Sequence, residues 1–109
     1  MGHDISGFNK AGEEIAYARF SMQNRNVSIL YTLLDATQYD AGVSGSGNSM
    51  SYSTQQLEEA LREFNRLFGK INLSSRNDFN IIDLKQIRDF IENCLATAQR
   101  DGNVRVAFA

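Results

Sequence analysis

The chain has 109 residues, of which 42% are hydrophobic, 22% charged and 10% aromatic. We expect a single domain over residues 1–109, because this length is typical of one domain with one modest core. Eleven basic and thirteen acidic side chains give a formal net charge of −2, which excludes the strongly basic composition of an electrostatic nucleic-acid binder. One Cys and one His exclude an intrachain disulfide and a zinc cage of Cys and His ligands.

The first twenty residues carry charged side chains at Asp4, Lys10 and Glu13 and contain no continuous apolar stretch. A secretory signal needs about 7–15 apolar residues, and a membrane span needs about 20. Neither pattern occurs in the sequence. Together with the single Cys, this favours the cytoplasm as the compartment and argues against a membrane partner.

Residues 4–20 show the alternating pattern of a β-hairpin. The turn falls at residues 9–12, where Gly12 can adopt the positive φ that tight connections often require. In the second strand, Tyr17 falls on one face and Ala18 and Phe20 fall on the other.

A first helix is predicted over residues 26–38. Its apolar side chains recur at the i, i+3, i+4 and i+7 spacing of one helical stripe, at Val27, Leu30, Tyr31 and Leu34. A second apolar stripe lies beside the first, so we expect this helix to pack on more than one side.

Residues 39–52 lose all periodicity and are predicted to form a long loop. Ten of these fourteen residues are Tyr, Ser, Gly or Asn, a mixture that is typical of adaptable recognition loops. A mobile loop with no ligand is the alternative interpretation. If the loop recognises a partner, the expected contact residues are Tyr39, Asp40, Ser44, Asn48 and Tyr52.

Residues 42–49 also match the spacing of a phosphate-binding P-loop, G-x-x-x-x-G-K-[ST]. Asn48 stands at the lysine position, so the cation that the phosphates require is missing. The segment also follows a helical pattern, whereas a P-loop follows a buried strand. A phosphate-binding domain or enzyme that uses this loop stays open as an alternative.

A second helix begins after Ser53, which with Gln56 makes the spacing of a capping box. We expect Gly69 to end this helix in the left-handed conformation. Residues 70–79 follow as a polar connection. A third helix is predicted over residues 80–99, with Cys94 on its apolar stripe as an unreactive core residue.

After a turn at residues 101–103, residues 104–108 alternate as a closing strand, with Val104, Val106 and Phe108 inward. The predicted order is therefore β-β-α-α-α-β, in the α+β class. A lone strand and a lone hairpin are unstable in water. We therefore expect the C-terminal strand to join the hairpin in a three-stranded sheet, with the helices on one face.

Residues that could carry chemistry are few. His3 and Asp4 are adjacent, and neighbouring strand residues point to opposite faces, so Asp4 is badly placed to orient His3. We expect His3 to face solvent near the terminus. Glu59 and Glu63 lie one turn apart on the face of the second predicted helix that we expect to be exposed to solvent. The sequence predicts no catalytic, metal or cofactor residue and favours a function other than catalysis.

The favoured hypothesis is a small binding or regulatory protein that acts through protein–protein interaction. Its size and simplicity suit a bacterial or phage accessory factor with another protein as its partner. Nucleic-acid binding is disfavoured because acidic residues intersperse with Arg62, Arg66 and Lys70 along the second helix. A homo-oligomeric structural protein, joined through a sheet edge or an apolar helix face, is the remaining alternative.

Overall fold

The computed structural model describes residues 2–71 and 79–109. Four strands form one sheet: β1 (Gly2–Phe8), β2 (Glu14–Ser21), β3 (Asn48–Ser53) and β4 (Asn103–Phe108). Helical segments make up most of the rest: α1 (Val27–Leu33), the short 3-10 helix η1 (Thr37–Tyr39), α2 (Thr54–Phe68) and α3 (Phe79–Asp101). The α+β class is therefore confirmed.

All strand pairs in the sheet are antiparallel, in the order β2-β1-β4-β3. The predicted hairpin is present, and Gly12 in its turn has a φ of +84°. The C-terminal strand joins the hairpin as expected, with Ser6 opposite Ala107. The prediction of three strands was wrong, because β3 adds a fourth at the far side of β4.

Strand β3 lies inside the segment that we predicted as a loop over residues 39–52. It contains three serines, an asparagine, a methionine and a tyrosine, so the apolar alternation that indicates a strand is weak. Its pairing with β4 supplies the order that its own sequence does not indicate. The pairing places Met50 opposite Val106 and Tyr52 opposite Val104 on the inner face of the sheet.

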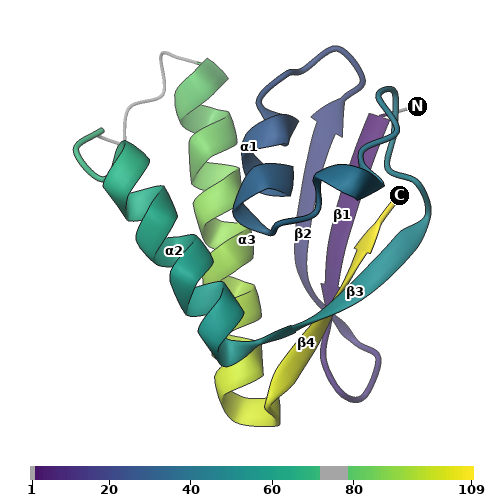
Figure 1. Cartoon of the computed structure of the whole chain (residues 1–109), viewed down its shortest axis with the longest axis vertical. Coiled ribbons are helices and arrows are strands. Elements are labelled where there is room, and N and C mark those ends of the chain that lie inside the picture. Colours follow the sequence, from purple (N-terminus) through teal and green to yellow (C-terminus); the bar gives the residue numbers. More distant parts are fainter. Residues whose placement is uncertain (1, 72–78) are drawn as a thin grey trace.

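The helices cover one face of the sheet (Figure 1). Val104, Val106 and Phe108 of β4 are buried beneath them, as predicted, whereas Arg105 between them is exposed. Helix α3 packs on the sheet, and α2 packs on α3. Cys94 of α3 is fully buried in this core, which confirms the prediction for that residue.

Helix α1 ends earlier than residue 38, the predicted limit, because the chain reverses at Asp35. Asp35 has a φ of +51°, and its amide donates to the Thr32 carbonyl at 3.1 Å. The Ala36 amide donates to the Tyr31 carbonyl at 2.8 Å. These two bonds around a left-handed residue form a Schellman motif, which satisfies the last carbonyls and stops the helix.

Helix α2 starts as predicted, because the Ser53 and Gln56 side chains each bond the other residue's backbone amide. Its end differs from the prediction. Gly69 has a φ of −64°, and its amide donates to the Asn65 carbonyl at 2.8 Å, so the chain continues in a right-handed turn. Most of the predicted polar connection over residues 70–79 lies outside the described residues.

Candidate binding surface

Residues 40–47, which we call loop 40–47, fold against the end of β4. Asp40 and Gly45 form an isolated β-bridge. The Gly45 amide donates to the Ala109 carbonyl at 3.0 Å, and the Gly47 amide donates to the Phe108 carbonyl at 2.7 Å. A Cβ atom at Gly45 would lie 2.5 Å from the backbone of Phe108, so the close approach requires glycine. The loop is therefore an ordered extension of the sheet.

His3 fastens loop 40–47 to the core, which corrects the prediction that it faces solvent. The side chain is 1% exposed. Its Nε2 lies 3.0 Å from the Gly42 carbonyl oxygen, and its Nδ1 lies 2.9 Å from the Tyr31 hydroxyl. A carbonyl only accepts, so Nε2 carries the proton and, in the neutral ring, Nδ1 accepts from Tyr31. One side chain thus joins β1, α1 and the loop.

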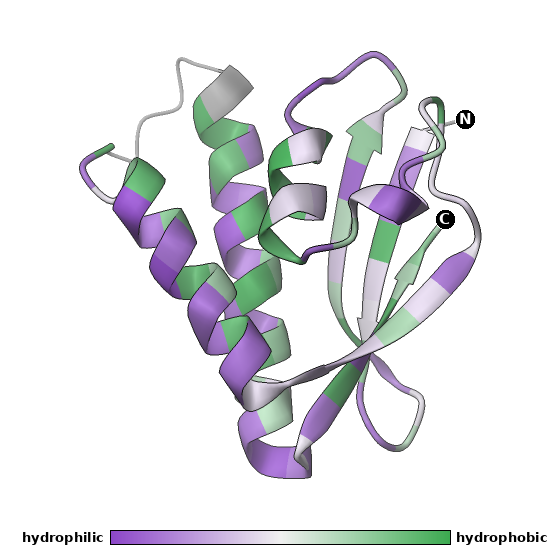
Figure 2. Cartoon of the chain, in the orientation of Figure 1, coloured by the Kyte–Doolittle hydropathy of each residue, from purple (hydrophilic) through white to green (hydrophobic). Residues whose placement is uncertain are grey.

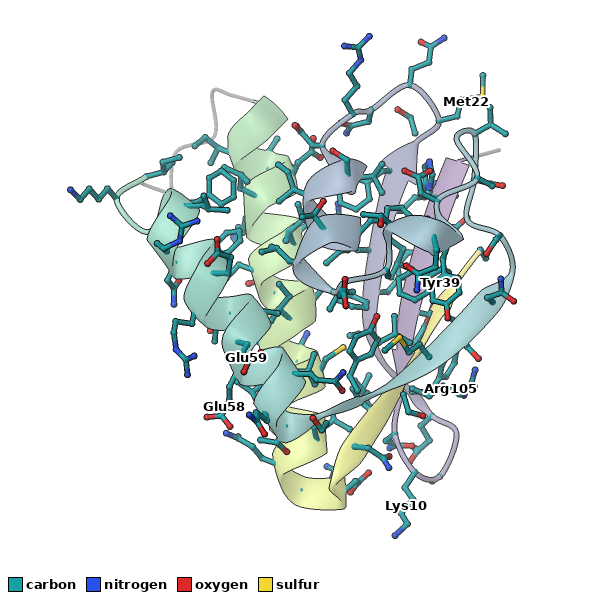
Figure 3. The ribbon with its side chains drawn as sticks, in the orientation of Figure 1. Lys10, Met22, Tyr39, Glu58, Glu59 and Arg105 are labelled. Carbon is teal, nitrogen blue, oxygen red and sulfur yellow. The ribbon has the colours of Figure 1, made fainter. Side chains whose placement is uncertain are left out.

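Beside His3 lies a hollow of about 550 Å³. Its lining contains one basic side chain, Arg25, and one acidic side chain, Asp40. Met22, which is 47% exposed, lies at the same end of the molecule (Figure 3). Within the described ranges, no group of three or more His, Cys, Asp or Glu side chains could hold a metal ion.

The structure separates the two tyrosines among the predicted contact residues. Tyr39 is half-buried and stacks on Phe108, with ring centroids 5.3 Å apart and an interplanar angle of 26° (Figure 3). Tyr52 is 2% exposed, and its hydroxyl donates to the Leu34 carbonyl at 2.8 Å. Burial raises the pKa of Tyr52, so this hydroxyl stays neutral. A partner can touch part of Tyr39, whereas Tyr52 belongs to the core.

The three remaining predicted contact residues gather on and beside loop 40–47. One carboxylate oxygen of Asp40 accepts from the Gly42 amide at 2.8 Å. The Ser44 hydroxyl donates to the Gly45 carbonyl at 2.9 Å, and the Asn48 amide donates to the Ser46 hydroxyl at 2.8 Å. Asp40 and Asn48 are exposed and Ser44 is partly exposed. These polar side chains are held in place by short-range bonds.

The P-loop interpretation needs backbone amides that converge on a phosphate. Four amides of this segment instead donate within the chain: Gly42 to Asp40, Gly45 to Ala109, Ser46 to Tyr39 and Gly47 to Phe108. Phosphate binding in the P-loop manner would require several of these bonds to break, which argues against it.

The two edges of the sheet differ. At the β2 edge, the Gln86 side chain of α3 accepts from the Arg19 amide at 2.8 Å and donates to the Arg19 carbonyl at 3.1 Å. This pair of bonds imitates a neighbouring strand and closes the edge at Arg19, in the second half of β2. No signal in the sequence identified Gln86, because a lone Gln on a helix has no distinctive pattern.

At the other edge of the sheet, the register shows which backbone groups of β3 point away from β4. Asp4 and Ala109 exchange two backbone bonds of 3.0 and 2.9 Å, so Ala109 directs its amide and carbonyl toward β1. Alternation along β4 then directs the backbone groups of Ala107 and Arg105 toward β1 as well. Ser49 and Ser51 lie opposite these two residues, so their amides and carbonyls point away from β4.

Strand β3 has no charged residue and no proline, two of the devices that discourage strand addition at an edge. It is pale over much of its length in the hydropathy colouring (Figure 2). On the outer face, Ser49 and Ser51 are exposed beside Arg105 of β4, whose guanidinium lies 4.5 Å from the centre of the Phe8 ring (Figure 3). We call the outward backbone of Ser49 and Ser51 the β3 edge.

Comparison of the chain with protein-family models, curated proteins and solved structures finds no match. Among the described residues, no helix combines the length and apolar character that crossing a membrane requires. The β3 edge and loop 40–47 are therefore the observations from which we infer a function.

Proposed function

We propose that this chain is a protein-binding domain that adds an extended segment of a partner protein to the β3 edge. The observation that carries the proposal is the difference between the two sheet edges. Gln86 closes the β2 edge at Arg19, whereas the amides and carbonyls of Ser49 and Ser51 point outward. A strand edge of this kind is a template for another strand.

Strand addition uses main-chain hydrogen bonds for affinity and alternate side chains for specificity. Ser49 and Ser51 present four backbone groups, enough to place an incoming strand in register. On the outer face their small side chains leave room for large partner side chains. On the inner face, Met50 and Tyr39 are half-buried and offer apolar contact.

Loop 40–47 adds polar contacts at the start of β3. Asp40, Ser44 and Asn48 are the proposed contact residues there, with the accessible part of Tyr39 beside them. His3 fixes the loop through Gly42, so the partner does not have to order it. A preorganised surface binds more tightly because less conformational freedom is lost on binding. Tyr52 is left out of the surface because it is buried.

The proposed role is that of a small accessory factor that binds a larger protein partner in the cytoplasm. A chain whose single cysteine is buried is compatible with a compartment in which thiols stay reduced. The proposal includes no reaction.

The substitution Ser51→Pro tests the proposal. Peptides that bind the intact chain are selected from a displayed library of extended sequences, and their affinities are measured for Ser51→Pro and Ser51→Thr. The Ser51 amide points away from β4, so proline there leaves the β3–β4 pairing intact but removes a donor from the edge. We expect Ser51→Pro to weaken binding at least tenfold and Ser51→Thr to retain it.

Equal binding to both variants, or a library that yields no ligand for the β3 edge, would contradict the proposal.

The alternative occupant of the same edge is a second copy of this chain. Two β3 strands can pair without like-charge repulsion, because neither carries a charge. Sedimentation of the intact chain at several concentrations separates the cases: a dimer that Ser51→Pro dissociates would assign the edge to self-association.

A further inference from the structure

A second surface lies between α1 and α2, and the buried Tyr52 of β3 also lines it. It is a groove of about 420 Å³, within the size range of natural ligand pockets. Its apolar lining comes from both helices: Ile29 and Leu33 from α1, and Leu67 and Phe68 from α2. Leu67 is 48% exposed, a large apolar side chain left half in water. Figure 2 shows hydrophobic colour on the last turn of α2.

Among the described residues that line this α1–α2 groove, the charged ones are acidic: Asp35, Glu59 and Glu63. Glu63 is paired with Arg66, which lowers the pKa of the Glu63 carboxyl. Within residues 2–71 and 79–109, neither Asp35 nor Glu59 forms an ion pair. The rim therefore presents negative charge to whatever enters the groove.

The backbone conformation of Asp35 fixes the position of one carboxylate of the acidic rim. It occupies the left-handed position that ends α1, with a φ of +51°, where glycine is the residue with the least strain. Asp35 thus places a carboxylate at this strained position, beside the apolar lining. Strained non-glycine residues concentrate at binding sites, where the surrounding structure holds them.

We propose that the α1–α2 groove binds a basic amphipathic helix of a partner protein. The apolar face of that helix would cover Leu33 and Leu67, and its Lys or Arg side chains would lie against Asp35 and Glu59. A groove between two helices suits a third helix that inserts side chains at i, i+3 or i+4, and i+7. The acidic rim selects basic flanks over acidic ones. This site does not depend on the β3 edge.

The test uses designed helical peptides of about 12 residues, a length of about 18 Å that matches most of α2. Each peptide carries leucines at positions i, i+4 and i+7, flanked by lysines in one version and by glutamates in another. Titration of the intact chain is followed by NMR. We expect the lysine peptide to shift signals of Leu33 and Leu67, to bind at least tenfold more tightly than the glutamate peptide, and to weaken with salt.

Two adjacent carboxylates on α2 provide a matched control (Figure 3). Glu59 lines the groove, whereas Glu58 is outside its lining. We expect Glu59→Gln to weaken the lysine peptide several-fold and Glu58→Gln to leave it unchanged. Asp35→Gly should also weaken binding several-fold while thermal stability is kept, since glycine relieves the backbone strain. Leu67→Lys, at an exposed position, should abolish binding in a folded chain.

Several outcomes would overturn the proposal. Equal affinity for the lysine and glutamate peptides would show that the acidic rim does not select basic partners. Equal effects of Glu58→Gln and Glu59→Gln would show that the peptide binds outside the groove. Concentration-dependent association that Leu67→Lys relieves would assign the groove to a second copy of the chain. Binding of a small apolar amine, with no peptide binding, would assign it to a small ligand.

Discussion

At the scale of single residues, His3 shows how one side chain can order a loop. Its ring lies between the Tyr31 hydroxyl and the Gly42 carbonyl, and both ring nitrogens are satisfied. The period-2 pattern of β1 places His3 on the same face as Ile5, which is the inner face. The sequence carried this hint, but a polar side chain near the start of the chain suggested exposure. Burial of His3 depends on partners 28 and 39 residues away.

We predict that His3→Ala destabilises the fold by about 2–4 kcal/mol, because it leaves a cavity and removes the hydrogen-bond partner of the buried Tyr31 hydroxyl. Urea unfolding measures the loss of stability. Amide hydrogen exchange should also accelerate at Gly45 and Gly47, since the loop loses its anchor. Met22→Ala is the control, because Met22 is exposed near the same hollow and should change stability by at most about 0.5 kcal/mol. Unchanged exchange in loop 40–47 would contradict the anchoring role.

Burial of ionisable side chains predicts sensitivity to alkali. Burial raises the pKa of the Cys94 thiol to about 12, and burial with the nearby Asp40 charge raises the pKa of Tyr31 to about 12. Between about pH 9 and pH 12 the unfolded chain releases protons that the folded chain retains, so stability falls as the pH rises.

From Cys94 alone, the expected loss between about pH 8 and about pH 10.5 is about 2 kcal/mol. Urea midpoints at the two pH values measure it. Cys94→Ala should reduce this pH dependence, although it lowers stability at both pH values by leaving a cavity. A midpoint that does not move between the two pH values would show that the thiol and hydroxyl are more accessible than their burial indicates.

At the scale of elements, the strongest local patterns predicted the structure well. The β1–β2 hairpin, the Ser53 capping box of α2 and the alternation of β4 all use short-range signals that the chain itself contains. Strand β3 could not be found in the same way. Its serines favour neither a strand nor a loop. The strand forms because it pairs with Val104 and Val106 of β4, more than fifty residues further along the chain. The end of α1 was also missed, since Asp35 is an unusual residue for the left-handed position.

The two sheet edges lead to a prediction about Gln86. Gln86→Ala removes both bonds to the Arg19 backbone, so the β2 edge becomes available for pairing. We expect concentration-dependent self-association of this variant in sedimentation velocity. Lys85→Ala, a change at the exposed neighbouring position, should sediment as the intact chain does. If Gln86→Ala also sediments as the intact chain does, the Gln86 side chain is not what keeps the β2 edge closed.

At the scale of the whole molecule, the helices shield one face of the sheet while β3 stands at its border. The predicted contact set was partly separated by folding: Asp40, Ser44 and Asn48 remain at the surface, Tyr39 is shared with the core, and Tyr52 is buried. Composition could identify the segment as unusual. It could not show which side chains face outward, because that depends on the register between β3 and β4.

Strand addition at the β3 edge is best tested by amide hydrogen exchange of the intact chain with a selected peptide bound. We predict strong protection at the Ser49 and Ser51 amides, because both donate outward to an added strand. Protection at the Arg19 amide should not change, since Gln86 already accepts from it. Protection confined to other parts of the surface, with Ser49 and Ser51 exchanging as fast as in the unbound chain, would contradict the claim that the β3 edge is the binding site.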